Sequence, residues 1–232
     1  MMISKKEIVK YKNGVRVNIE DDLVNELKFT IAYKFRELST ILCSPENIED
    51  LTAGYLYTSG LLKKAKLMHM NFNEEKKVML FELDDDSVIK DMIISKLEPV
   101  GCGAGRQVFF ENGSNRNVCP QIKISAENVS NLMNDFNNRS VIFKTTGGVH
   151  SSAIADTGSI LVFREDIGRH NAVDKVIGNM YLSNIPLDDK ILLTSGRISS
   201  EIVMKLANCN IQIIISRSAP TLRAVELAVE NG

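Results

Sequence analysis

The sequence predicts an α/β protein (α+β overall), built from a small mixed unit followed by a unit with a mixed, mostly parallel sheet. From residue 126 onward, apolar strand-like runs alternate with helical runs, which indicates crossover connections and a parallel sheet. The first hundred residues instead contain several strand-like runs around one helix. The 232 residues, 44 % of them hydrophobic, suffice for one large domain or two small ones. We expect a small mixed domain over residues 1–120 and a second domain over residues 121–232.

In the first unit, "EIVKYKNG" and "VRVNIE" predict a hairpin that turns at Asn13-Gly14. The run "ELKFTIAYKF" predicts another strand. A helix is expected from "SPENIEDLTAGYLYTSG", with Ser44 as N-cap, Pro45 in the first turn and an end at Gly60. Two further strands are predicted at "LMHMNFN" and "KKVMLFEL".

In the second unit, "AENVSNLMNDFNN" has helical spacing. The run "GGVHSSAIADTGSILVFRED" predicts two strands joined by a turn at residues 156–158. Helices are then expected at "GRHNAVDKVIGNMYL", at "SSEIVMKLAN" and at "APTLRAVELAVE", the last with Pro220 in its first turn. The strands "KILLT" and "IQIIIS" lie between these helices.

Composition excludes several classes of function. Lys and Arg number 28 against 29 Asp and Glu, so no overall field attracts nucleic acid or an anionic membrane. No run approaches the ~20 apolar residues that span a bilayer, and "MMISKKEIVKYKNG" has no signal-peptide core, so we expect a cytoplasmic protein. The four cysteines are scattered and form no close Cys or His pair, which argues against a zinc site and against a disulfide framework.

Three strand-to-helix turns of the second unit are expected at one edge of its sheet, where α/β proteins bind ligands. Each turn combines an arginine with hydroxyl or glycine residues, in residues 164–171, 195–197 and 216–221. Arginine forks and helix N-terminal N–H groups suit phosphate, so we predict a crevice for a phosphate-bearing ligand. The alternative is a set of capped helix starts with solvated arginines. His170 is expected on the wall of this crevice, His150 could face either way, and His69 is expected to be structural or on the surface.

The stretch "EPVGCGAGRQ" places Cys102 among glycines, which give the backbone conformations that other residues rarely reach. Cys102 is either a spare loop residue or a reactive thiol that has to move. A dinucleotide fingerprint is rejected here because Pro99 precedes the glycines and no helix follows them. Cys209, before an apolar run, is expected to be a small core residue, whereas Cys43 and Cys119 receive no role.

Together these residues resemble the formate dehydrogenase accessory sulfurtransferase family. The matching segments are "AGYLYTSGLL", "TTGGVHSSAIAD", "FREDIGRHNAVDKVIG", "LLTSGRISSEIVMK" and "SRSAPTLRAVELA", which cover most of residues 50–228. The resemblance implies a second domain with the three-layer α/β/α fold of cytidine deaminases. Zinc deamination is excluded, because Arg169-His170-Asn171 and Ser195-Gly196-Arg197 stand where a deaminase has its metal ligands and glutamate.

The resemblance also implies a function, that of a sulfur carrier required for formate dehydrogenase. A cysteine desulfurase would leave a persulfide on Cys102, and the sulfur would pass to a molybdenum (or tungsten) bis(guanine dinucleotide) cofactor before that cofactor enters formate dehydrogenase. A mobile tether suits a thiol that visits two partners, and Arg106 could stabilise the thiolate. The implied protein is a cytoplasmic homodimer without zinc. The expected cofactor-binding residues are Gly147, Gly148, His150, Asp166, Arg169, His170, Asn171, Lys175, Ser195, Gly196, Arg197, Ser218, Ala219, Pro220 and Thr221.

Two departures from the family pattern keep a second hypothesis open. Many members carry Cys-Gly-x-Cys in the cysteine loop, whereas Gly105 stands at the second cysteine position here, so Cys102 would act alone. Members usually continue after "AVELA" with a strand and a Gly-Phe-x-Arg segment, but this sequence ends at Gly232, through truncation or through a different mode of cofactor binding. The alternative function is therefore a cofactor-binding chaperone that moves no sulfur.

Overall fold

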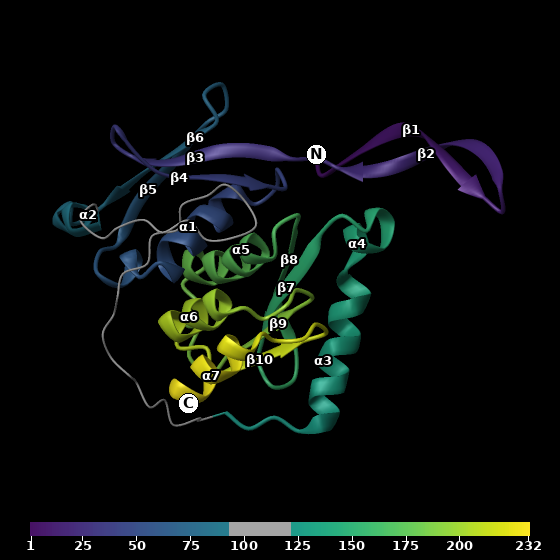
Figure 1. The fold of residues 1–232 in the computed structure, drawn as a ribbon. Coiled ribbons are helices and arrows are strands. Elements are labelled where there is room, and N and C mark those ends of the chain that lie inside the picture. The colour runs from purple at the N-terminus through teal and green to yellow at the C-terminus, as the bar shows by residue number, and fades with distance from the viewer. Residues whose placement is uncertain (93–121) are drawn as a thin grey trace.

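A computed structural model describes residues 1–92 and 122–232 of the chain (Figure 1). The strands within these two ranges form one two-stranded ribbon and two four-stranded sheets. Cys102 and the boundary expected at Pro120 lie outside the described residues, so the division into two domains stays a prediction. None of the helices in the described ranges is long and apolar enough to cross a membrane.

The ribbon consists of β1 (Ile3–Lys12) and β2 (Val15–Val24), paired antiparallel over their whole length. The predicted turn is confirmed: Asn13 and Gly14 have φ angles of 53° and 82°. Both values lie in the left-handed region, as a type I′ turn requires at its two central positions.

The first four-stranded sheet has the order β4-β3-β6-β5, and α1 packs on one of its faces. The parallel pair β3–β6 lies at its centre, with antiparallel pairs on both sides. Its elements are β3 (Leu27–Tyr33), β4 (Arg36–Cys43), α1 (Ile48–Thr58), a 3-10 turn (Leu61–Lys63), β5 (Leu67–Asn73), β6 (Val78–Leu83) and α2 (Ser87–Met92). Strand β4 was not predicted, because the turn before it is made by Lys34 at φ 53° instead of by a glycine or an asparagine.

The expected capping of α1 by Ser44 is wrong. The helix begins at Ile48, and its N-cap is Asn47 in the left-handed conformation. The Ser44 hydroxyl instead accepts a hydrogen bond from the backbone N–H of Ile167, 123 residues further along the chain. A tertiary contact therefore uses the side chain that the local pattern assigned to the helix.

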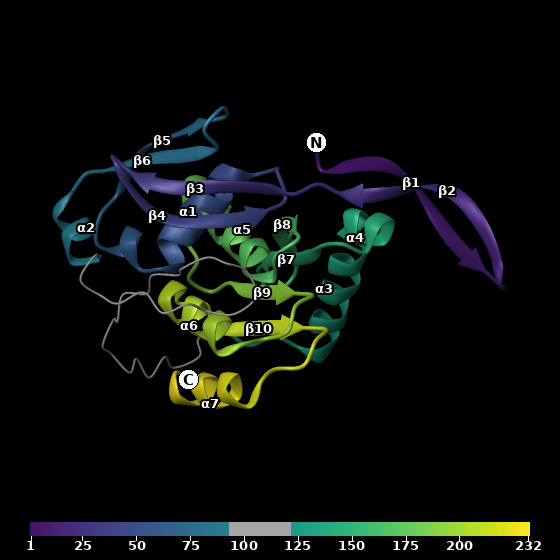
Figure 2. The same ribbon diagram turned by 45° about the horizontal axis from the view of Figure 1, so that its top comes forward.

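The second four-stranded sheet has the order β10-β9-β7-β8 and lies between helices (Figure 2). α3 packs on one face through Leu132 and Phe136, and α5 and α6 cover the other. The elements are α3 (Ala126–Arg139), α4 (Val141–Thr146), β7 (His150–Ala155), β8 (Ile160–Asp166), α5 (Arg169–Leu182), β9 (Ile191–Thr194), α6 (Ser200–Cys209), β10 (Ile213–Ser216) and α7 (Leu222–Glu230).

The second sheet is mixed, as expected, but the expectation that it is mostly parallel is wrong, because among its described strands only β9 and β10 pair in parallel. β7 lies between β8 and β9 and is antiparallel to both. β8, β9 and β10 therefore still run in one direction, and the hairpin strand β7 separates the first of them from the other two. Pro220 is also outside α7, because Thr221 is the N-cap of that helix and Leu222 its first residue.

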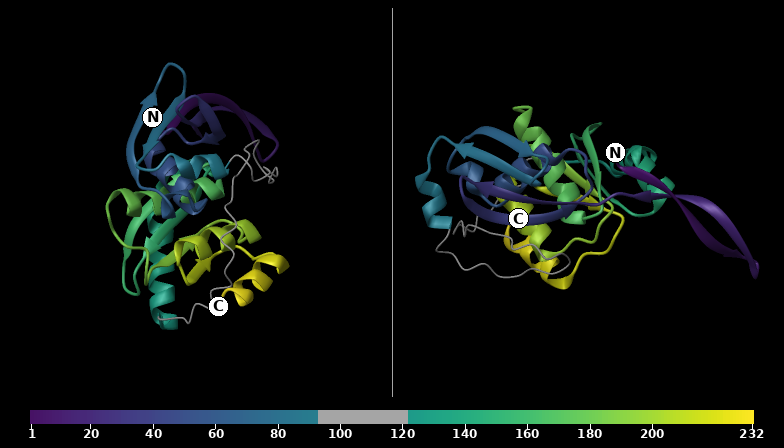
Figure 3. Two further views of the ribbon diagram at one scale, coloured as in Figure 1. Left: turned by 90° about the vertical axis from the view of Figure 1, so that its left-hand side faces the viewer. Right: turned by 90° about the horizontal axis from the view of Figure 1, so that it is seen from above.

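Helices α1 and α5 join the two four-stranded sheets at very close range (Figure 3). A Cβ atom at Gly54 of α1 would overlap the backbone carbonyl of Asp174, and one at Gly178 of α5 would overlap that of Asp50. The Asp50 carboxylate also accepts from Arg164 Nε at 2.9 Å. The two glycines thus let the helix backbones touch, since no side chain keeps them apart.

Candidate functional site

The predicted edge of the second sheet is present, with one addition. Since β8, β9 and β10 run in one direction and β7 in the other, three carboxyl ends and the amino end of β7 share this edge. His150 pairs with Asp166, and Ser152 pairs with Thr194. The antiparallel strand is therefore what brings the Gly147-Gly148-His150 segment to the three arginine-containing turns. We call this edge the arginine edge, defined by residues 147–150, 166–170, 195–199 and 216–221.

The first turn of the arginine edge is built around the buried carboxylate of Asp166. Its Oδ1 accepts from Gly168 N at 2.8 Å and from Asn171 Nδ2 at 2.9 Å. Its Oδ2 accepts from Ser44 N at 3.0 Å and lies 2.7 Å from Lys175 Nζ. The Asp166 and Lys175 side chains are both fully buried. These residues therefore tie the start of α5 to the segment after β4.

The second and third turns are tied to each other by their small polar groups. Ser195 Oγ accepts from Ser151 N at 2.9 Å, and Ser218 Oγ donates to the Ser195 carbonyl at 2.8 Å. Ser216 Oγ donates to the Gly196 carbonyl at 2.9 Å. Thr221 N donates to the Ile198 carbonyl at 3.0 Å, next to a β-bridge between Ile198 and Pro220. The turns are thus held rigidly, a property that a preformed ligand site requires.

Arg169, the first residue of α5, is the most unusual group at this edge. Its Nε is buried, and it has no hydrogen-bond partner among the described residues. Its side chain lies against Gly196, where an added Cβ would stand 2.8 Å from Arg169 Cβ. Buried donors are normally paired, so an unpaired guanidinium nitrogen here points to an acceptor supplied by a ligand.

His170 is neutral and held in place beside Arg169. Burial, with Lys205, Arg169 and His150 as positive or polar neighbours, lowers the pKa of His170 to about 3. Its Nε2 lies 3.0 Å from Glu201 Oε2, and burial raises the pKa of that carboxyl group. Although the distance would allow an ion pair, a neutral imidazole that donates Nε2–H to the carboxylate fits the low pKa better. Burial also lowers the pKa of His150, with a further contribution from Arg169.

The other two arginines of the edge are exposed. No ion pair joins Arg197 to Glu165, Asp166 or Glu201 in the described structure. Arg217 stacks over the Phe143 ring of α4, 5.4 Å from guanidinium carbon to ring centroid. Glu165 caps α4 by accepting from Ile142 N and Phe143 N at 3.1 and 3.0 Å. Helix α4 was not predicted, because the six residues of "VIFKTT" make fewer than two turns and give no periodic signal.

The predicted cofactor-binding residues thus lie at the arginine edge, except for Asn171 and Lys175 further along α5, but they differ in availability. Arg169 has an unpartnered Nε, and Arg197 and Ala219 are exposed, so these three can meet a ligand. The side chains of Asp166, Asn171 and Lys175 instead form hydrogen bonds or an ion pair within the protein. In the described residues, no group of three or more His, Cys, Asp or Glu side chains could hold a metal ion.

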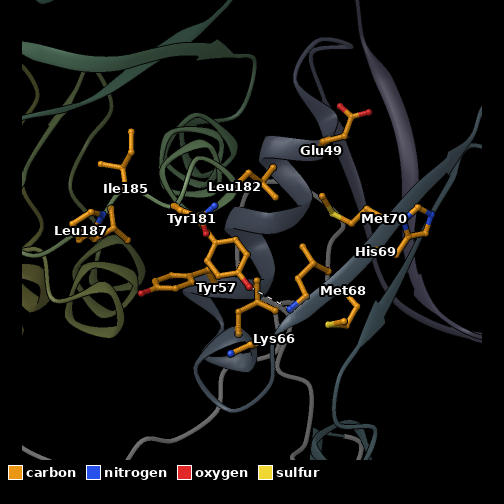
Figure 4. A pocket seen from close by; sticks show the side chains of 14 residues that line it. Glu49, Tyr57, Lys66, Met68, His69, Met70, Tyr181, Leu182, Ile185 and Leu187 are labelled. Carbon is orange, nitrogen blue, oxygen red and sulfur yellow. Dashed lines mark hydrogen bonds between the residues drawn. The ribbon is translucent and has the colours of Figure 1, made fainter.

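A separate hollow of about 890 Å³ lies between β5 and the C-terminal end of α5 (Figure 4). Its walls are mostly apolar and include Tyr57 and Tyr181, whose rings lie 5.4 Å apart. Tyr181 accepts from Leu67 N at 3.2 Å through its hydroxyl group, and the exposed His69 stands at the margin. None of the predicted cofactor-binding residues, all of which lie in the described ranges, lines this hollow.

Comparison with known proteins places the chain by its sequence. Residues 24–232 match the model of the FdhD/NarQ family. The chain belongs to the FdhD/NarQ family. The sulfur carrier protein FdhD of Bacillus subtilis (strain 168) is 35 % identical over 230 residues, which are 97 % of this chain and 87 % of that protein. The sulfur carrier protein FdhD of Staphylococcus aureus (strain MRSA252) is 36 % identical over 225 residues, 95 % and 85 % of the two chains.

The fold of this FdhD/NarQ member has also been seen before. A crystal structure of a candidate formate dehydrogenase accessory protein from Desulfotalea psychrophila superposes with a TM-score of 0.77 at 22 % sequence identity. The match covers all of this chain and 90 % of that one. The family resemblance read from the sequence is therefore confirmed, and the arrangement of the two four-stranded sheets belongs to a known fold.

Proposed function

We propose that this chain is a sulfur carrier for formate dehydrogenase and acts as a sulfurtransferase through a persulfide on Cys102. The names of the FdhD relatives support the sulfur-carrying role. The unpaired Arg169 Nε at a rigid edge between strand ends supports the binding of an anionic cargo. The cargo would be the molybdenum bis(guanine dinucleotide) cofactor, the donor a cysteine desulfurase and the recipient formate dehydrogenase.

The first transfer needs no redox partner. The Cys102 thiolate attacks the outer sulfur of the desulfurase persulfide, a new S–S bond forms to Cys102, and the desulfurase cysteine leaves as a thiolate. The second transfer delivers this sulfur to the metal at the sulfide level, which requires two electrons from the metal centre or from a thiol reductant.

The two described cysteines do not compete for this role. Cys43 and Cys209 are buried, and burial raises the pKa of each thiol to about 12. Only a thiolate is nucleophilic, so both are inert at neutral pH. Cys209 belongs to the core, as its sequence context predicts. The candidates that remain, Cys102 and Cys119, lie outside the described residues.

The arginine edge would bind the phosphates of one guanine dinucleotide. Arg169 is placed to donate from Nε, Arg197 and the stacked Arg217 add positive charge, and the Gly147-Gly148 backbone approaches from β7. Asp166, Asn171 and Lys175 would act indirectly, by holding the first turn in shape. The protein would work as a cytoplasmic homodimer.

A mass-spectrometric assay tests the central step and separates the carrier from the alternative, a cofactor chaperone without sulfur transfer. The chain is incubated with a cysteine desulfurase and cysteine, and the peptide that contains Cys102 is examined for a persulfide. The carrier role predicts the adduct in the wild type and in the matched control Cys119→Ser, and its loss in Cys102→Ser. Normal maturation of formate dehydrogenase by Cys102→Ser would refute the mechanism.

A further inference from the structure

The ribbon of β1 and β2 projects away from both four-stranded sheets (Figures 1 and 3). At about 3.4 Å per residue, its ten-residue strands reach some 34 Å. A hydrogen bond from Asn25 N to the Met2 carbonyl, 2.8 Å long, closes the base of the ribbon, and Val24 packs against Gly148 of the second unit. Beyond this base most of its residues are exposed. A lone two-stranded ribbon is marginally stable in water, so this one calls for a covering surface.

The strand register sorts the ribbon side chains into two faces, because residues paired across an antiparallel ladder point the same way. We name one the lysine face and the other the tyrosine face. The lysine face holds the pairs Ser4–Leu23, Lys6–Asp21, Ile8–Ile19, Lys10–Val17 and Lys12–Val15. The tyrosine face holds the pairs Ile3–Val24, Lys5–Asp22, Glu7–Glu20, Val9–Asn18 and Tyr11–Arg16.

Charge decides which face suits a second copy of the chain. The lysine face carries three lysines and a single aspartate, so two such faces would repel each other. The tyrosine face carries Lys5 and Arg16 against Glu7, Glu20 and Asp22, and its charges are ordered along the ribbon. Arg16 stands at the tip, Glu7 and Glu20 lie in the middle, and Lys5 and Asp22 lie opposite each other toward the base. If the ribbon is reversed about the Val9–Asn18 row, the arginine at the tip of one copy meets the middle acids of the other.

The middle of the tyrosine face carries two acidic side chains with no strong cationic partner in the described structure. Glu7 and Glu20 stand directly opposite each other, and like charges in this position destabilise a strand pair. The nearest cation is Lys5, whose Nζ lies 3.7 Å from Glu20 Oε1, and both side chains are more than half exposed. Such an exposed pair contributes little, so the two acids are still open to a stronger cation.

We propose that the tyrosine face packs against the same face of a second copy, across a two-fold axis that lies along the Val9–Asn18 row. This operation reverses the ribbon, so Arg16 of each copy lies over the partner's Glu20, and Tyr11 lies beside the partner's Glu7. Val9, which is 45 % exposed, meets its own copy at the axis, and the 72 % exposed Tyr11 ring is covered. In a two-fold contact each favourable pair forms twice, once from each copy to the other.

The inference rests on the proposed homodimer and names its contact surface. From the Val9–Asn18 row to the strand ends at Lys12 and Val15 is three residues, or about 10 Å, so the two ribbons overlap over about 20 by 10 Å. This is roughly 200 Å² per copy, less than the ~800 Å² per partner of a standard interface. The contact is therefore weak and sensitive to salt, and the dimer it supports depends on protein concentration.

Charge exchange provides the test. Arg16→Glu and Glu20→Lys are purified separately, and the dissociation constant of the dimer is measured by sedimentation over a range of concentrations. In either variant both symmetry-related contacts become repulsive, so we expect the dissociation constant to rise about tenfold or more. Mixing the two variants makes both contacts attractive again, and a heterodimer as tight as the wild-type dimer should form. Arg36→Glu, an exposed arginine of β4 remote from the ribbon, is the matched control and should leave the dimer unchanged.

The outcomes separate the two proposals. A dimer that tolerates Arg16→Glu and Glu20→Lys would overturn the ribbon contact and leave the homodimer standing on another surface. A wild-type chain that stays monomeric at all concentrations would overturn both. Weakening of each single variant without recovery on mixing would also overturn the two-fold arrangement, because it would show that the charges act elsewhere.

Discussion

Replacing Asp166 by asparagine tests whether the buried network at the first turn frames the site or binds the ligand. Asp166 Oδ2 lies 2.7 Å from Lys175 Nζ, and neither side chain is exposed. After the change, the ammonium group keeps only the Ser44 carbonyl, 3.3 Å away. The new amide also turns a donor toward Ser44 N or Gly168 N, where an acceptor is needed. Removing one partner of a buried ion pair costs about 3–5 kcal/mol.

The effect is large enough to measure by chemical or thermal unfolding. At about 2–4 °C per kcal/mol for a chain of this length, the melting temperature should fall by roughly 6–20 °C. The double variant Asp166→Asn/Lys175→Met is the control, because it removes the stranded ammonium group and should be more stable than the single variant. A loss below about 1 kcal/mol, accompanied by weaker binding of GDP, would refute the framing role and make Asp166 a ligand residue.

Three further predictions concern the helix contact, pH and the ligand. Gly178→Ala should cost about 3 kcal/mol in unfolding free energy, since its Cβ would overlap a backbone carbonyl of α1, whereas the control Gly158→Ala, with nothing nearer than 3.7 Å, should be neutral. Because the pKa of His170 falls from 6.5 to about 3 on folding, the unfolded chain takes up a proton that the folded chain refuses. Stability should therefore drop as the pH falls from 6.5 toward 3, by up to about 1.4 kcal/mol per unit, and His170→Gln should flatten this dependence in urea titrations at several pH values. Arg197→Ala should weaken GDP binding about tenfold in calorimetry and leave the melting temperature unchanged, and unchanged affinity, or an equal loss in Arg36→Ala, would count against the arginine edge.

The sequence predicted correctly those turns and helices that are determined by residues close together in the chain. Asn13-Gly14 makes the turn that its conformational preferences demand, and the helical spacing of "AENVSNLMNDFNN" matches α3. The three arginine-containing turns were predicted to share an edge because strand-to-helix alternation fixes strand direction, and they do. The position of β7 between β8 and β9 could not be predicted. A hairpin of β7 and β8 fixes only that these two strands pair, and it leaves open whether β9 pairs with β7 or with β8.

Predictions failed where a distant partner decided the outcome. Ser44 has the sequence context of a helix N-cap, yet it bonds Ile167 and Asp166, more than 120 residues away. The polar residues after Arg169 read as ligand contacts because their pattern is polar at a helix start. The structure shows that Asn171 bonds the Leu42 carbonyl, so part of this polarity serves the packing of one half of the chain on the other.

The glycine contact between α1 and α5 bears on how the chain reaches its native state. Helices from opposite sides of residue 100 meet backbone to backbone, so neither helix face can be satisfied until both have formed and found each other. To pair, the helices must close a long loop, and the entropy of the chain falls before the contact between them adds stability. Such a contact raises the contact order and slows folding. We therefore expect the described halves to melt in one cooperative transition, and a fragment that lacks α1 to leave the glycine face of α5 open to association with other chains.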